Sequence, residues 1–186
     1  MAALFNPIPN VGSQLERAVL ALLRDAYDAD GADYKFLFSN DWQTRTAPYI
    51  EVLAHKSTEV VPHTGNETFM VRIEWKWRGN NVAGQTNNDA NWQDINEFVG
   101  IGMAALSQTA GNLGNPNTLP FTVAAEITRL GRALAVSDPT NQADMADFTC
   151  SYVEFKGSQR AESDGVDFFI KEVRNFEMRA CPYNVD

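Results

Sequence analysis

The chain has few of the residues on which most enzyme active sites depend. Its 186 residues include two histidines, His55 and His63, and neither lies at metal-ligand spacing from a cysteine or another histidine. No nucleophile-elbow, zinc-protease or phosphate-loop pattern occurs, and Gly100-Ile101-Gly102 falls inside an apolar helical segment, where it favours helix packing. We therefore predict no catalytic residue, no metal site, no cofactor and no enzyme activity. A hydrolase with a carboxylate pair assembled in space stays open as an alternative.

Cysteines and long apolar runs are scarce as well. The two cysteines, Cys150 and Cys181, fit reduced core residues better than a disulfide framework. The first residues carry no basic segment followed by an apolar stretch of signal-peptide length, and no run approaches the roughly 20 apolar residues of a membrane span. These features predict a protein made and kept in the cytoplasm, with no membrane partner.

Basic residues are unevenly distributed. The formal net charge is −9, and no lysine occurs between Trp77 and Phe155. Neutralising phosphates requires clustered lysine and arginine, so the composition argues against a nucleic-acid groove. The acidic excess is either a solubilising surface or the lining of a functional surface.

The most informative stretch is Thr68–Arg78, in which apolar residues occupy every odd position from Phe69 to Trp77 and charged residues occupy every even position from Arg72 to Arg78. A period of two over this length predicts a half-buried β-strand with its aromatic face against a large apolar surface. The alternating charges on the other face predict contact with water or a polar partner.

Periodicity and turn residues predict the remaining elements in the order α-β-β-β-α-α-β-β. Residues 1–12 are expected to form an extended arm, followed by a single domain over 13–186 with long loops at 79–91 and 108–120. A capping box of Ser13 and Glu16 predicts the start of the first helix, and Val173 suggests a bulge in the last strand. The predicted helices are Gln14–Tyr27, Trp92–Ser107 and Phe121–Val136, and the predicted strands are Tyr34–Phe38, Pro48–His55, Thr68–Arg78, Asp147–Lys156 and Phe168–Cys181. We predict an α+β fold: an antiparallel sheet of about four to five strands with helices packed on one face.

Two groups of residues follow from this arrangement. The predicted core comprises Phe69, Val71, Ile73, Trp75, Trp77, Leu15, Val19, Leu22, Phe176 and Met178. The predicted interface residues, which lie in the arm or at loop edges, are Phe5, Pro7, Ile8, Trp42, His63 and Trp92.

The order and character of these elements resemble those of the tail-terminator and head–tail joining proteins of tailed bacteriophages. The resemblance spans residues 13–181 and rests on the leading amphipathic helix, the hairpin PYIEVLAH…TFMVRIEWKWRG, the helical middle and the final strand ending FEMRACPYNVD. It implies a homo-oligomeric ring, commonly a hexamer, in the virion neck. Such a ring caps the tail tube, docks to the head connector and leaves a channel through which DNA passes without specific binding.

Under this hypothesis the arm and the loops at 56–67, 79–91 and 108–120 make contacts between subunits or with neck partners. An acidic bias suits a channel past which DNA slides, because like charges remove the gain from counterion release. The alternative from another class is a small-ligand binding module with an aromatic pocket formed by some of Trp42, Trp75, Trp77 and Trp92.

Overall fold

The computed structural model confirms the α+β fold and the predicted order of elements. It describes residues 11–30, 35–38, 48–59, 67–78, 88–107, 122–137, 148–163 and 169–182. The described elements are α1 (Val11–Asp30), β1 (Lys35–Phe38), β2 (Tyr49–Glu59), β3 (Glu67–Arg78), α2 (Asn88–Leu106), α3 (Thr122–Ser137), β4 (Phe148–Ser163) and β5 (Phe169–Pro182).

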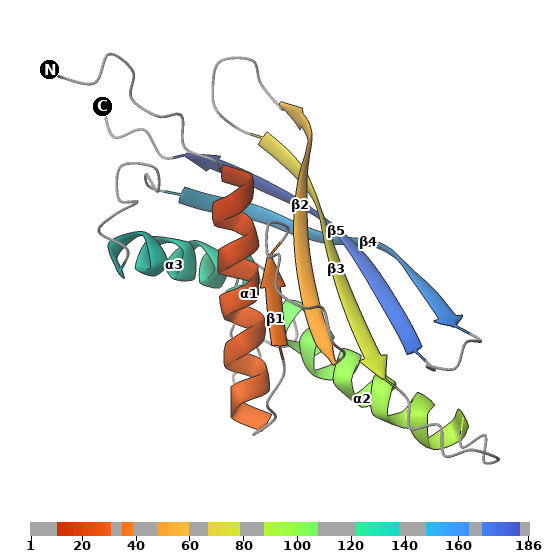
Figure 1. The fold of residues 1–186 in the computed structure, drawn as a ribbon. Helices are drawn as coiled ribbons and strands as arrows, with labels where there is room; N and C mark the ends of the chain where they lie inside the picture. Colours follow the sequence, from red (N-terminus) through yellow and green to blue (C-terminus); the bar gives the residue numbers. More distant parts are fainter. Residues whose placement is uncertain are drawn as a thin grey trace, which may run out of the picture.

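The strands form one sheet in the order β1-β2-β3-β5-β4 (Figure 1). Strand β3 is antiparallel to both β2 and β5, and β5 is antiparallel to β4. Strand β1 instead pairs with β2 in parallel, from Lys35 opposite Tyr49 to Phe38 opposite Val52. The sheet is therefore not wholly antiparallel as predicted. Two strands that follow each other in the chain can pair in parallel only if the connection returns to the same end of the sheet. The alternation within each strand does not show the direction of the connection, so the sequence did not reveal the parallel pair.

The alternation in Thr68–Arg78 sets the two faces of the sheet. Odd-numbered β3 residues face the helices, and register places Trp75 opposite Glu172 and Val71 opposite Phe176. The prediction for the core is confirmed: eight of its members are buried and the remaining two, Leu22 and Trp77, are partly buried against the same cluster. We call the face that carries the even-numbered β3 residues the outer face of the sheet.

The helices α1 and α2 meet at Trp75, which is fully buried. The Trp75 indole donates its Nε1–H to the Tyr27 hydroxyl at 2.8 Å, and that hydroxyl donates in turn to the Phe98 carbonyl of α2. A Cβ atom at Gly102 would lie 2.7 Å from Trp75 Cζ2, so glycine is what allows α2 to lie this close to β3. The prediction that the paired glycines permit packing is confirmed for Gly102.

Several element boundaries differ from the prediction at the start of the helices. Helix α1 begins at Val11, so Ser13 lies in its first turn and the predicted capping box is wrong. Helix α2 begins at Asn88 rather than Trp92, which shortens the expected loop 79–91. The start of α2 was misplaced because its mostly polar first residues, 88–91, carry no apolar periodicity. The start of α1 was misplaced because Ser13 resembles an N-cap residue, although the buried Val11 lies four residues before Leu15 on the same helix face. Val11 and Gly12, predicted to end the extended arm, belong to α1, so the predicted arm boundary at residue 12 is wrong. Residues 1–10 of the arm and the loop 108–120 lie outside the described residues.

The predicted bulge at Val173 is also wrong, because β5 pairs with β3 without interruption. The register shifts instead lie in β2 between Lys56 and Thr58, and in β4 at Cys150/Tyr152 and at Phe155/Gly157. Gly157 adopts φ 151°, a backbone conformation that disfavours other residues. It therefore continues β4 through a bulge to Ser163, where a turn at Gly157–Gly165 was predicted.

Candidate assembly surface

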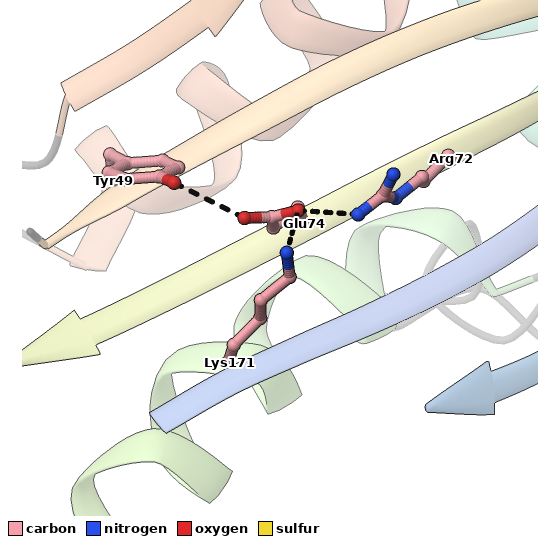
Figure 2. A network of polar contacts seen from close by, with 4 residues as sticks. All are labelled: Tyr49, Arg72, Glu74 and Lys171. Atoms are coloured by element: carbon pink, nitrogen blue, oxygen red, sulfur yellow. Dashed lines mark hydrogen bonds and ion pairs between the residues drawn. The ribbon is translucent and has the colours of Figure 1, made fainter. Parts of the chain in front are cut away.

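A polar network covers the outer face of the sheet around Glu74 (Figure 2). Its side chain is only 8% exposed, although it points away from the helices. One carboxylate oxygen accepts from the Tyr49 hydroxyl at 3.2 Å, and the other lies 2.7 Å from Arg72 Nη2 and 2.9 Å from Lys171 Nζ. The two cations lie over the carboxylate and remain more exposed than it, so positive groups are the outermost atoms here.

A second polar group on the outer face joins β4 and β5. Lys156 contacts Glu154 and lies 3.5 Å from Glu177, and the Arg179 guanidinium lies 5.0 Å from the centre of the Tyr152 ring. The hydrogen bond from Lys156, followed by that from Tyr152, lowers the pKa of Glu154. The register places Glu154 directly opposite Glu177, and Lys156 contacts both carboxylates, which offsets the repulsion between them.

A third network lies on the helix side of the sheet and centres on Glu172. This carboxylate, 3% exposed, contacts Arg160 Nε at 2.5 Å and Arg174 Nη2 at 2.6 Å. Arg160 also donates to the Asn96 Oδ1 of α2 at 2.8 Å. The network ties the far end of β4 to α2 through polar contacts, and a buried charge in such a network is expensive to leave unpaired.

Helix side chains cap both edges of the sheet. Strand β1 ends at Phe38, opposite Val52, and just beyond it the Ala54 N–H donates to the Glu16 carboxylate of α1 at 2.8 Å. On the opposite edge the Cys150 N–H donates to the Thr128 hydroxyl of α3 at 2.9 Å, and that hydroxyl lies 3.1 Å from the Cys150 carbonyl oxygen. These contacts satisfy backbone groups that an edge strand otherwise presents to other chains.

The distal segment of β4, residues 154–163, lies beyond the α3 cap (Figure 1). From Glu154 to Ala161 every side chain except the Gly157 position is exposed. Phe155 is 45% exposed and is the exposed large apolar residue of the described chain. Its ring contacts Phe176 at a centroid distance of 5.6 Å, and the Arg174 guanidinium lies 5.7 Å from its centre. An extended edge with an exposed aromatic ring is typical of a surface that pairs with another protein.

The structure tests only part of the interface prediction. Phe5, Pro7, Ile8, Trp42 and His63 lie outside the described residues, and Trp92 falls within α2 with its side chain undescribed. Trp75 fills the core, as predicted, and Trp77 packs on Phe98 with ring centroids 5.3 Å apart. Cys150 is a buried free thiol, in agreement with the predicted core role.

The candidate features that the sequence did not predict are the distal segment of β4 and the buried carboxylates Glu74 and Glu172. The adjacent polar and apolar pair Glu172–Val173 was the available signal for a buried carboxylate, but it was interpreted as a bulge. Among the described residues, no group of three or more histidine, cysteine or acidic side chains is arranged to hold a metal ion. Within the same part of the chain, no helix is both long and apolar enough to cross a membrane.

Comparison with known proteins adds no further assignment. No protein-family model matches the chain, and no curated protein is significantly similar to it.

Proposed function

We propose that the protein is a structural virion subunit, a phage tail terminator or head–tail joining protein, that assembles as a ring at the neck. In this role the ring, a hexamer in our proposal, caps the tail tube, docks to the head connector and leaves a channel for DNA. The observation that carries the proposal is the distal segment of β4. Helix α3 caps this edge strand at Cys150, whereas residues 154–161 present an extended, exposed edge bearing Phe155.

The resemblance to neck proteins gives this edge a use. A ring subunit needs a surface that meets a different surface of the next copy, and an exposed strand edge provides backbone donors and acceptors for such a contact. The net charge of −9 fits a channel that DNA passes without being retained.

The test is the mass of the native protein by light scattering over a range of concentrations, with negative-stain images of the same samples and of samples mixed with tail tubes. We expect closed rings with a central hole. The substitution Phe155→Asp should abolish the rings while leaving the monomer folded, because it places a charge on the exposed aromatic position.

Ala125→Asp is the matched control, since it adds the same charge at an exposed position of α3. Rings that form normally with Phe155→Asp would show that the distal segment of β4 is not the contact. A wild-type protein that stays monomeric even beside tail tubes would contradict the proposed function itself.

A further inference from the structure

The backbone groups of the distal segment of β4 have a direction that the α3 cap defines. The N–H and the C=O of Cys150 both lie within hydrogen-bonding distance of the Thr128 hydroxyl, so this residue points away from β5 and toward the sheet edge. In an antiparallel pair, residues that bond the neighbouring strand alternate with residues that point away from it. Cys150 lies opposite Ala180, and the other β4 residues opposite even-numbered β5 positions, including Phe155 and Ser158, therefore point to the edge as well. In the described sheet β5 is the single strand neighbour of β4, so these groups face the edge that a further strand can bond.

The charged side chains around this edge already have partners. Lys156 contacts Glu154, and Arg160 contacts Glu172. A charged occupant would compete with these ion pairs, whereas a neutral strand bonds the backbone and covers the Phe155 ring, which is 45% exposed. The edge therefore favours an uncharged, partly apolar segment in extended conformation.

Residues 1–10, which precede α1, have this composition. The segment MAALFNPIPN contains no acidic or basic side chain, and Pro7 and Pro9 occupy alternate positions. Successive residues of an extended strand direct their N–H groups to opposite sides, so both missing N–H groups would fall on one side. The other side, which includes Asn6 and Ile8, keeps its donors. A segment of this kind can bond a strand on one side only and then ends the sheet, which is where proline is tolerated in strands.

We propose that residues 4–9 of one copy add to the distal segment of β4 in the next copy as an antiparallel strand. This inference rests on the proposed assembly function and identifies the segment that meets the edge, since an arm folded onto its own copy would cover the edge that the ring needs. Directly opposed residues of an antiparallel pair share a face. The side of the arm that bonds the edge therefore places Leu4 and Ile8 on the face of the sheet that carries Phe155.

The two halves of this contact belong to opposite ends of the sheet. Helix α1, which follows the arm, begins at the end where β5 finishes, whereas the distal segment of β4 runs to the other end (Figure 1). An arm and a strand edge are also different surfaces, so the contact is head-to-tail and leaves one of each available on every added copy. Such contacts build a ring when the rotation between copies closes.

Proline placement tests the pairing in the full-length protein. Asn6→Pro removes an N–H from the side of the arm that faces β4, and Asn6→Ala keeps that N–H, so the two variants isolate the backbone donor. Pro7→Ala adds an N–H on the opposite side. In sedimentation, Asn6→Pro should self-associate at least about tenfold more weakly than wild type, because a main-chain hydrogen bond is lost and the proline ring obstructs the strand. Asn6→Ala and Pro7→Ala should associate as the wild type does.

Hydrogen exchange followed by mass spectrometry provides the second readout. At concentrations where the wild type is associated, the amides of residues 154–162 should exchange at least about fivefold more slowly than in Asn6→Pro. The amides of the central strand β3 should exchange equally in both proteins, which separates lost pairing from lost folding.

Rings that form equally well with Asn6→Pro overturn the inference and leave the proposed function standing. Protection at residues 54–59 of β2 in place of 154–162 identifies another acceptor strand and overturns it as well. A wild-type monomer in which Asn6→Pro removes protection from 154–162 shows that the arm covers its own copy, which contradicts both this contact and the ring. Filaments without closed rings that Asn6→Pro weakens and Asn6→Ala does not weaken support the contact and contradict the ring.

Discussion

Strands β3 and β4 show two ways in which a strand can be stabilised in this sheet. β3 is central, and its helix-facing side chains from Phe69 to Trp75 are buried under α1 and α2. β4 is an edge strand: its start is capped by Thr128, but the distal segment is exposed and reaches the helical layer through the polar Arg160–Asn96 contact. Apolar burial therefore supports folding in β3, whereas the distal segment of β4 is the part of the described sheet that we propose for assembly.

The largest expected difference between the strands is in the response to losing an aromatic ring. Trp75→Ala removes a fully buried side chain and should lower the free energy of unfolding by about 3–5 kcal/mol, a large share of the about 5–15 kcal/mol typical of a domain. Phe155→Ala removes a 45% exposed ring and should lower it by about 1 kcal/mol or less. Urea denaturation of both variants measures the difference. Equal losses would show that the distal segment of β4 belongs to the core.

A smaller effect is expected from adding a methyl group where α2 approaches β3. Gly102→Ala places a Cβ 2.7 Å from Trp75 Cζ2 and 2.9 Å from the Tyr27 hydroxyl oxygen, so the packed rings must shift at a cost of about 1–3 kcal/mol. Gly100→Ala meets no atom within 4 Å and should stabilise α2 by up to about 1 kcal/mol through helix propensity. Thermal melts of the two variants compare the cost of close packing at Gly102 with the gain in helix propensity at Gly100. Stabilisation by both substitutions would contradict the close approach of α2 to Trp75.

The sequence predicts β3 well and β4 poorly, for a physical reason. Burial on one face imposes the period of two in Thr68–Arg78, so the pattern alone identifies the strand and its core residues. The side chains from Glu154 to Ala161 are exposed except at Gly157, so this stretch carries no such period, and Gly157–Gly165 resembles a polar turn. The Glu74 and Glu172 networks depend on cross-strand partners such as Arg160 and Lys171, and the pairing of strands cannot be derived from local spacing.

The Thr128 cap offers a test of the boundary within β4. Thr128→Val keeps the side-chain shape but removes the hydroxyl that accepts from the Cys150 N–H, and leaving that group unpaired should cost about 1–3 kcal/mol. Thr128→Ser keeps the hydroxyl and serves as the control. Hydrogen exchange followed by NMR should show faster exchange at Cys150 with valine and little change in residues 154–161. A loss of protection along the whole strand would indicate that the cap also holds the distal segment.

Removing a surface ion pair should change the free energy of unfolding least. The change should be the same for the pair on α3 as for the pair on β4. The hydrogen bond from Arg129 lowers the pKa of Glu126 on α3, and the hydrogen bond from Lys156 lowers the pKa of Glu154 on β4. A lowered folded-state pKa contributes stability above the unfolded pKa of about 4.3, and this contribution is lost as pH falls through the folded pKa.

Arg129→Gln and Lys156→Gln should each return the pKa of the neighbouring carboxyl group toward its ordinary value, which an NMR titration measures. The free energy of unfolding at neutral pH should change too little to resolve by denaturation, because solvent screens exposed ion pairs. If Lys156→Gln instead destabilised the protein clearly while Arg129→Gln did not, charge pairing would be holding the distal segment of β4 in place. Equal, negligible effects would mean that electrostatics does not distinguish the two strands. The difference between β3 and β4 would then rest on apolar burial and on the capping of backbone groups at the sheet edge, which are the two properties that a second copy docking on the distal segment can supply.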